Sequence, residues 1–193
     1  MTLSVCVYCG SRFGDDPVFE RVARRLGASL GARRGRLVYG GGRVGLMGAV
    51  ADAALAAGAL VVGVIPQALM DREVGHAGLS ELHVVQTMHE RKQLMAERAD
   101  AFVALPGGIG TLEELYEVWS WQQLGYHDKP VALLNVDGYY DELLAFMRTG
   151  HRRGFVSDAQ HRALIVDDDV ERLLDRVAQA AAKATAPDDY SRI

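Results

Sequence analysis

The sequence of 193 residues is poor in cysteine, in lysine and in long hydrophobic runs, and each shortage excludes a class of protein. Its longest run without a charged or strongly polar residue, Ala53–Ile65, falls well short of the ~20 residues that a membrane-spanning helix needs. Residues 1–11 carry no basic side chain, which disfavours a secretory signal. We therefore expect a cytoplasmic protein with no membrane partner.

An excess of basic residues is also missing. The chain has 21 basic and 25 acidic residues, a net charge of −4, so no overall field draws it to nucleic acid. Hydrophobic residues make up 49% and charged residues 24%, which is ordinary for a globular protein and argues against disorder. These figures favour a small-molecule partner and no nucleic-acid partner.

The only two cysteines, Cys6 and Cys9, have the C-x-x-C spacing of redox proteins. The segment around them is rich in β-branched and aromatic residues, which predicts a buried strand. Three strand residues span about 10 Å and place the two side chains on opposite faces, so the thiols cannot pair. The histidines are scattered and form no ligand spacing, and we expect no metal.

Apolar β-rich runs alternate with helical stretches along the whole chain, which predicts an α/β fold with a mostly parallel sheet and helices on both faces. We expect a single domain over residues 1–184 and a loose polar C-terminal tail over residues 185–193. Strands are predicted at Leu3–Tyr8, Arg36–Tyr39, Leu60–Ile65, Leu82–Gln86, Ala101–Leu105, Pro130–Asn135 and Leu164–Val166, and helices at Pro17–Ala32, Gly45–Ala57, Met88–Arg98, Thr111–Leu124, Tyr139–Arg152 and Val170–Ala184.

Loops that follow parallel strands gather at one edge of the sheet, where ligands bind. The first such loop contains Gly10 and Ser11. A glycine allows close backbone approach and a serine hydroxyl can bond a phosphate or sugar oxygen. A plain strand-to-helix turn explains these two residues about as well.

The second loop, Gly40–Gly48 (GGGRVGLMG), contains G-x-G-x-x-G before a helix. That spacing can hold a diphosphate, but a dinucleotide site also needs an acid at the end of the next strand. The strand ends at Ile65 without one, which disfavours a nicotinamide cofactor, and a Walker loop lacks its Lys-Ser/Thr. Nucleotide contact and simple packing of the helix on the strand both stay open.

The third loop, Leu105–Glu114 (LPGGIGTLEE), is the most informative. Pro106 stops a strand, three glycines free the backbone, and Thr111 is predicted to begin a helix whose amides suit a phosphate. Thr111 and Glu114 also match a capping box, in which each side chain bonds the other's backbone amide. The capping box explains those two residues but not the glycines.

A fourth segment, Thr87–Glu90, is another capping box, and it predicts a helix from about Met88. Arg91 lies on the apolar stripe of that helix, where it meets an unfavourable dipole and needs an anionic partner. The anion is a ligand phosphate or carboxylate, or else a structural carboxylate. Lys92 lies on the adjacent face.

Taken together, Pro106–Glu114, Gly40–Gly48 and Met88–Lys92 resemble the Lonely Guy (LOG) family, once mislabelled as lysine decarboxylases. The resemblance extends from Cys6 to Tyr140 and implies a Rossmann-like, doubly wound fold. It also implies hydrolysis of the N-glycosidic bond of cytokinin riboside 5′-monophosphates and AMP, with no cofactor. A decarboxylase dependent on pyridoxal phosphate is disfavoured because none of the three lysines has a suitable setting.

Carried over to this sequence, the resemblance implies that Arg91 and Glu114 are catalytic. It implies that the protein is a homodimer, to which Tyr116, Trp119 and Trp121 contribute contacts unless they are core residues. A non-catalytic module that binds a nucleotide or phosphorylated cofactor is the alternative function, and a DNA-binding relative is disfavoured by charge. The residues expected to bind substrate are Gly10, Ser11, Gly41, Gly42, Glu73, Met88, Lys92, Gly107, Gly108, Ile109, Gly110, Thr111, Leu112, Glu113 and Ser120.

Overall fold

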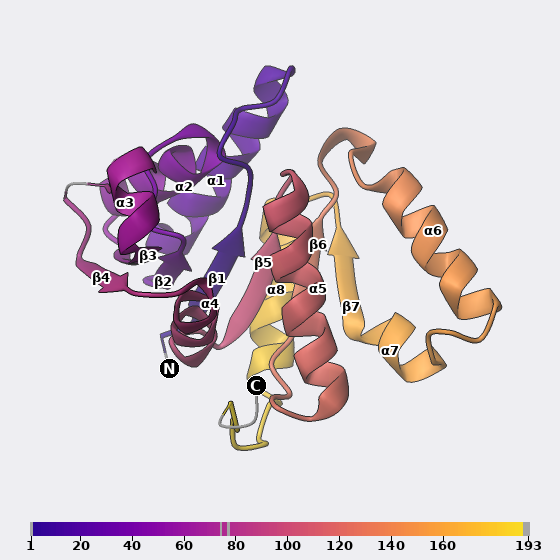
Figure 1. The fold of residues 1–193 in the computed structure, drawn as a ribbon. Helices are drawn as coiled ribbons and strands as arrows, with labels where there is room; N and C mark the ends of the chain where they lie inside the picture. Colours follow the sequence, from indigo (N-terminus) through magenta and orange to yellow (C-terminus); the bar gives the residue numbers. More distant parts are fainter. Residues whose placement is uncertain (1, 74, 77, 191–193) are drawn as a thin grey trace.

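The structure, a computed structural model, describes residues 2–73, 75–76 and 78–190, except for the side chains of residues 71–73. Seven strands form one sheet in the order β4-β3-β2-β1-β5-β6-β7, and every neighbouring pair is parallel (Figure 1). The predicted parallel α/β sheet is therefore confirmed. The strands are β1 (Ser4–Tyr8), β2 (Arg36–Tyr39), β3 (Leu60–Pro66), β4 (Glu81–Val85), β5 (Ala101–Ala104), β6 (Val131–Leu134) and β7 (Leu164–Asp167).

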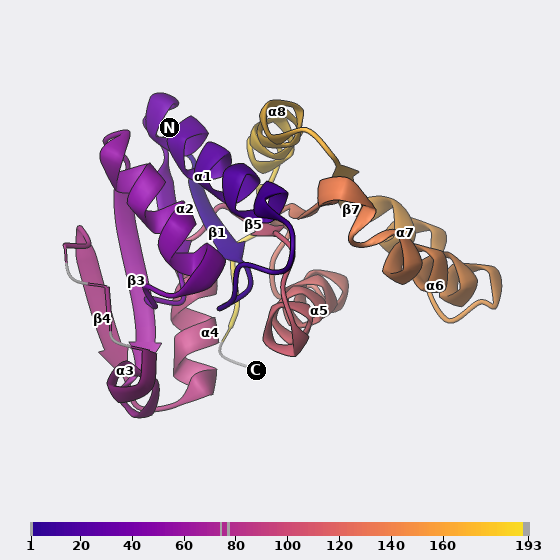
Figure 2. The ribbon, with the colours of Figure 1, turned by 90° about the horizontal axis from the view of Figure 1, so that it is seen from above.

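Helices cover both faces of the sheet, as Figure 2 shows from above. One face packs against α1 (Pro17–Ala32), α2 (Gly45–Ala56) and α8 (Val170–Ala181). The other packs against α4 (Met88–Glu97) and α5 (Ile109–Leu124). Each face has its own apolar core, as expected for a parallel sheet that is buried on both sides.

Two further helices lie outside the sheet, beyond its edge strand β7. The helices α6 (Asp141–Arg152) and α7 (Asp158–Ala163) extend away from the rest of the molecule (Figures 1 and 2). Only Met147 is buried on α6. This pair of helices therefore leaves much of its surface uncovered by the chain itself.

The two cysteines behave as the strand geometry predicts. Cys6 belongs to the core on the α4 and α5 side, and Cys9 belongs to the core on the other side. Both thiols are free and buried. The C-x-x-C spacing is therefore a consequence of two opposite cores and not a redox centre.

The structure corrects several predicted boundaries. Helix α5 begins at Ile109 after Gly108, with no side-chain cap, so the capping box expected at Thr111 and Glu114 is wrong. Thr111 lies inside the first turn and packs on Gly107, where an added Cβ would lie 2.1 Å from its hydroxyl oxygen. The missing side chain of Gly107 thus leaves room for Thr111 inside a helix that starts two residues earlier than predicted.

Short helices were also missed. The helices α3 (Gln67–Glu73) and α7 have seven and six residues, too few for a visible periodicity. A 3₁₀ turn, Val136–Gly138, contains the left-handed residue Asp137 and delays α6 to Asp141. The two short helices and the late start of α6 therefore depend on local turns, which leave no helical periodicity in the sequence.

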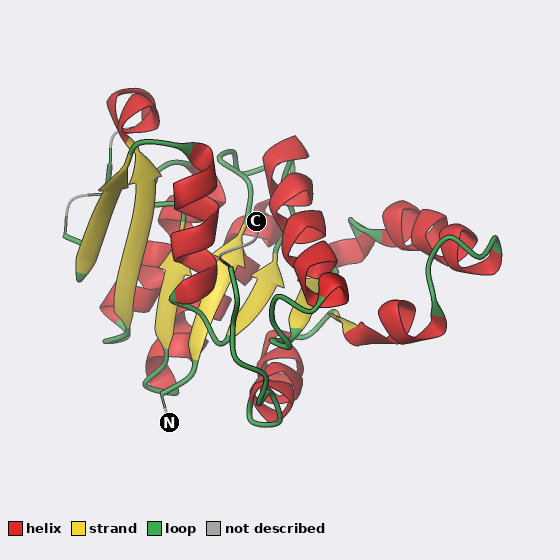
Figure 3. Ribbon diagram, turned by 60° about the horizontal axis from the view of Figure 1, so that its bottom comes forward, coloured by secondary structure: helices red, strands yellow, loops and turns green. Residues whose placement is uncertain are grey.

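Residues 185–190 of the predicted C-terminal tail are held by contacts with the domain, and residues 191–193 lie outside the described residues. The Asp128 carboxylate accepts hydrogen bonds from the backbone amides of Thr185 and Ala186. Tyr190 is buried against the rings of Trp121 and His127. The segment up to Tyr190 consequently packs against the apolar core on the α4 and α5 side of the sheet (Figure 3).

Candidate active site

The strand order reverses between β1 and β5, because the chain winds outward from β1 to β4 and from β5 to β7. At such a switch point the loops after the two strands part and leave a crevice. Here the Gly10 amide donates to the Pro106 carbonyl at 3.0 Å, and the Leu46 amide donates to the Gly10 carbonyl at 3.0 Å. Three strand-ending loops are thus tied together at one edge of the sheet.

A pocket of about 570 Å³ opens at this switch point. Several residues expected from the sequence line it, but so do Phe13, Phe19 and Tyr139, which sequence reasoning missed. Its predicted members come from the first and third loops only. They are Gly10, Ser11, Gly107, Gly108 and Ile109.

The start of α5 is open. Gly108 caps the helix without a side-chain bond, so the first amides have no side-chain acceptor. An added Cβ on Gly108 or Gly110 would meet no heavy atom within 4 Å, and both residues are exposed. Since neither has a positive φ, no contact or dihedral in the folded chain explains these glycines. The free amides, the helix dipole and the space beside them form a cradle for an anion.

Arg91 and Glu114 face each other from the first turns of α4 and α5. The predicted capping box of Thr87 and Glu90 is present and begins α4 at Met88. The Arg91 guanidinium is buried, with Nε donating to the Val64 carbonyl at 3.2 Å. Its Nη2 atom lies 3.9 Å from Oε1 of Glu114. A carboxylate of the chain itself therefore lies near Arg91, and a ligand anion stays open as a further partner.

Glu114 is the ionisable group whose surroundings point most clearly to a role in proton transfer. Burial raises its pKa to about 7, while the positive charge of Arg91 opposes that rise without cancelling it. A carboxyl group that titrates near neutrality can exchange protons at physiological pH. Its side chain is 12% exposed, so a small ligand or a water molecule can reach it.

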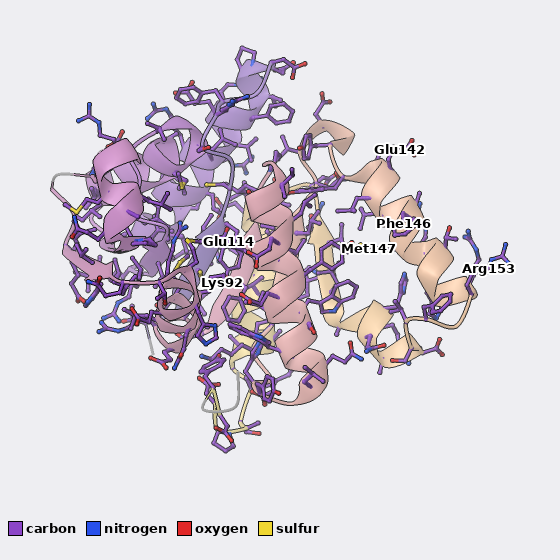
Figure 4. The ribbon with its side chains drawn as sticks, in the orientation of Figure 1. Lys92, Glu114, Glu142, Phe146, Met147 and Arg153 are labelled. Atoms are coloured by element: carbon purple, nitrogen blue, oxygen red, sulfur yellow. The ribbon has the colours of Figure 1, made fainter. Side chains whose placement is uncertain are left out.

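Lys92 forms a second bridge between the same helices. Its Nζ donates to Oε1 of Glu113 at 2.6 Å and to Oε1 of Glu117 at 2.8 Å. Lys92 and Glu114 lie in the space between α4 and α5 (Figure 4). The structure thus pairs Lys92 with Glu113, two residues expected to contact substrate, and adds Glu117, which the sequence did not single out.

The remaining predicted residues are spread over the edge. Met88 is 43% exposed, and its sulfur lies 3.8 Å from Nη1 of Arg91. Ser120 lies on the exposed side of α5, six residues and therefore about 240° of rotation from Glu114. Leu112 packs at the edge of the apolar core. Glu73 ends α3, and its side chain lies outside the described residues.

The second glycine loop is filled by the protein itself. Gly45 has φ +58°, and an added Cβ would lie 2.3 Å from the carbonyl carbon of Ser11. The start of α2 is therefore covered by the first loop and leaves no room for a diphosphate. Gly41 and Gly42 are buried, with a bridge between Gly42 and Gly75 and an amide of His76 donating to the Gly41 carbonyl.

Two tyrosines fix the third loop. The Tyr139 hydroxyl donates to the Gly107 carbonyl at 2.7 Å, and the Tyr140 hydroxyl donates to the Leu105 carbonyl at 2.6 Å. Both follow β6, the neighbour of β5 in the sheet. The Tyr-Tyr pair after a strand was the available signal, but its use required the strand order.

Comparison with known proteins identifies the family. Residues 47–177 match a family model described as "Possible lysine decarboxylase". The probable cytokinin riboside 5′-monophosphate phosphoribohydrolase LOG4 of Oryza sativa subsp. japonica is 50% identical over 93% of this chain and 78% of its own length. The chain belongs to the LOG family. Another member, the cytokinin riboside 5′-monophosphate phosphoribohydrolase of Rhodococcoides fascians, is 48% identical over 87% of this chain and 85% of its own.

The fold is shared more widely than the LOG family. The molybdenum cofactor binding protein from Rippkaea orientalis superimposes with a TM-score of 0.70 at 20% identity, covering 93% of this chain and 97% of that one. Identity at that level supports the Rossmann-like fold alone. The family model carries a decarboxylase description, whereas the two relatives are named as phosphoribohydrolases.

Within residues 2–73, 75–76 and 78–190, no three His, Cys, Asp or Glu side chains gather as metal ligands do. No helix in this described part is both long and apolar enough to span a membrane.

Proposed function

We propose that this LOG family member hydrolyses the N-glycosidic bond of adenine-type nucleoside 5′-monophosphates, releasing the free base and ribose 5-phosphate. The observation that carries the proposal is the position of Glu114. Its buried carboxyl group lies beside Arg91, little more than one helical turn after the open N-terminus of α5. The proposed phosphate site at the start of α5 and the proton-exchanging carboxyl group of Glu114 therefore lie on the same helix, little more than one turn apart.

The phosphate is assigned to the start of α5. The amides after Gly108 and the positive end of the helix dipole bind a dianion without a basic side chain. The open space at Gly108 and Gly110 admits the phosphate oxygens to the backbone. Binding the phosphate there fixes the ribose at a set distance from Glu114, which lowers the entropic part of the barrier.

Cleavage of the bond between C1′ and the base passes through an oxocarbenium-like ribose. Ionised Glu114 stabilises the positive charge on that sugar and accepts a proton from the attacking water. The water oxygen becomes the new hydroxyl on C1′, and the base leaves with the electron pair of the broken bond. The base takes up one proton, and Glu114 releases the proton that it accepted from water, so the step balances and Glu114 is ionised again. Arg91 orients the phosphate or sugar, or offsets negative charge on the departing purine.

Incubation of the purified protein with AMP and with isopentenyladenosine monophosphate tests this proposal. The expected result is release of adenine or isopentenyladenine together with ribose 5-phosphate, measured by chromatography. Binding of either nucleotide without base release would support the alternative, a carrier or sensor of a nucleotide or phosphorylated cofactor.

We also propose that the protein is a homodimer. Glu142, Phe146 and Arg153 lie along one exposed side of α6 (Figure 4), and Phe146 is 71% exposed. Glu142 and Arg153 are eleven residues apart, three helical turns, so they share a face. Two copies of α6 packed antiparallel would place each Glu142 against the partner's Arg153, with Phe146 near the axis.

The dimer proposal predicts a mass of twice 21.0 kDa by light scattering. Phe146→Glu should shift the protein toward the monomer. Leu124→Glu is the matched control, since Leu124 is 60% exposed and lies at the end of α5, on another element. Equal behaviour of the two variants would exclude the α6 contact. The cytoplasmic location expected from the sequence stays a prediction.

A further inference from the structure

Gly40 follows β2 directly, and nothing in its own backbone calls for glycine. It is buried, and it is absent from the residues of positive φ, unlike its neighbour Gly41 at φ +76°. Any L-residue could adopt its conformation. The reason for glycine at this position must therefore lie in what stands next to it.

The neighbour is the guanidinium of Arg91. A Cβ added to Gly40 would lie 1.9 Å from Nη2 of Arg91 and 3.1 Å from its Cζ, far inside van der Waals contact. The same Nη2 points at the Gly40 carbonyl at 3.4 Å, while Nε donates to the carbonyl of Val64. The carbonyl ends of β2 and β3 thus accept from one guanidinium, which occupies the volume that a side chain at residue 40 would fill.

We propose that Gly40 is a positioning residue, whose missing side chain forms the seat that holds Arg91 against Glu114. The inference rests on the proposed function and deepens it. The first glycine of the G-x-G-x-x-G pattern then serves the reaction through Arg91 and not through contact with a phosphate.

Alanine at position 40 would push the guanidinium out of this seat by more than 1 Å, because ordinary contact begins near 3.4 Å. The displaced group would lose its two carbonyl contacts and its place 3.9 Å from Glu114. A shift of about 1 Å at a catalytic group costs on the order of 10²-fold in rate. Gly40→Ala should therefore lower kcat by about that factor.

The pH profile gives a second signature. Arg91 lowers the pKa of Glu114, so moving Arg91 away raises that pKa further, and the rising limb of activity shifts to higher pH. The other groups that act on Glu114 keep their places in this variant. They are Lys92 on α4 and Glu113 and Glu117 on α5. Cys6, Tyr8 and Cys9 at β1 also face Glu114, and they stay neutral because burial raises the pKa of each.

A thermal-stability cycle tests the seat without using activity. Gly40→Ala alone should lower Tm by roughly 4–10 °C, the effect of overpacking in a domain of this size. In the Arg91→Ala background the added methyl group meets no guanidinium, so Gly40→Ala should change Tm by no more than about 1 °C. Equal Tm losses in the two backgrounds would overturn the proposal.

Activity of the same variants completes the test. Gly31→Ala is the matched control. Its Cβ would lie 2.7 Å from the carbonyl oxygen of Ala57, where α1 packs on α2, far from Arg91. It should lower Tm and leave the pH limb unchanged. A Gly40→Ala variant with the wild-type kcat and pH limb would also overturn the proposal. If the wild-type protein itself releases no base, the proposed function fails, and the stability cycle still decides whether Gly40 seats Arg91.

Discussion

Two glycine-rich loops of this protein look alike in sequence and differ in what occupies the space beside their glycines. In Gly40–Gly48 the space is filled by the chain, with the Arg91 guanidinium at Gly40 and the Ser11 backbone at Gly45. In Pro106–Glu114 the space beside Gly108 and Gly110 is empty. A glycine that the fold itself requires is structural, whereas a glycine that faces open space at a helix N-terminus indicates a ligand.

The two loops are nevertheless coupled. The first positions Arg91 on α4, and the second begins the helix that carries Glu114. The Arg91 guanidinium and the Glu114 carboxylate lie 3.9 Å apart, measured from Nη2 to Oε1. In the function proposed above, ligand binding and proton transfer belong to the loop after β5 and the helix α5 that follows it, and the loop after β2 supports Arg91.

The largest effect is expected at Glu114. Glu114→Gln keeps the shape of the side chain but removes the base, so turnover of AMP should fall by about 10²- to 10⁴-fold. Adenine release measured by chromatography gives the rate, and circular dichroism checks the fold. A variant near the wild-type rate would reduce Glu114 to a structural partner of Arg91.

The glycines themselves give the direct test of the comparison. Gly45→Ala should destabilise the protein by more than 3 kcal/mol, because its Cβ would meet the backbone of the first loop and its φ is positive. Gly110→Ala should instead raise Tm slightly, since alanine favours a helix, but raise KM for AMP by about 10-fold.

Thermal melts and steady-state kinetics on both variants measure these two effects. If Gly110→Ala binds AMP as well as the wild type, the open space at the start of α5 is not the phosphate cradle. If Gly45→Ala melts normally, the loop after β2 is less tightly packed than the contacts show.

The pH dependence of protein stability gives an independent measure of the pKa of Glu114. The pKa of Glu114 is raised from 4.5 to about 7, so the stabilising effect of its neutral form is complete below pH 4.5 and is lost as the pH rises through 7. The loss is at most about 3 kcal/mol. Glu114→Gln should therefore unfold at a higher temperature than the wild type at pH 8.

Below pH 4.5 the two proteins should melt together, because residue 114 is then neutral in both the folded and the unfolded state of each. A wild-type protein that matches Glu114→Gln at both pH values would show that Glu114 ionises normally. The proton-exchanging role assigned to the helix after the third loop would then fail.

The smallest effect is expected at the tyrosines behind the third loop. Tyr139→Phe removes the bond to the Gly107 carbonyl, a half-exposed contact worth about 0.5–1.5 kcal/mol, and should raise KM several-fold with kcat nearly unchanged. Tyr140→Phe is the control, because its buried bond to the Leu105 carbonyl lies one step further from the cradle. It should lower Tm by a few degrees and leave KM within about twofold.

Much of the fold could be read from the chain. The alternation of buried strands and helices predicted all seven strands of the sheet, and the capping box at Thr87 placed α4 correctly. The helices that were missed, α3 and α7, are short and show no period. The start of α5 was misplaced because Thr111 and Glu114 match a capping pattern, whereas the helix begins at Ile109 after Gly108 with no side-chain cap.

The site was predictable in part. The need of Arg91 for an anion follows from its place on an apolar stripe, and the structure places the Glu114 carboxylate 3.9 Å from it. The pairing of Lys92 with Glu113 and Glu117 was not predictable, because it depends on the spacing of two helices that are separated along the chain. The aromatic wall of the pocket likewise required the order of the strands.

The sequence by itself determined which residues could do chemistry and which segments end at the edge of the sheet, because periodicity, glycine and capping act over a few residues. Only the tertiary structure decided which glycines have protein atoms beside them and which face open space, and which charged side chains come close together. Those outcomes depend on distances between segments that are far apart in the chain, and the burial that raises the pKa of Glu114 exists only after they have packed together.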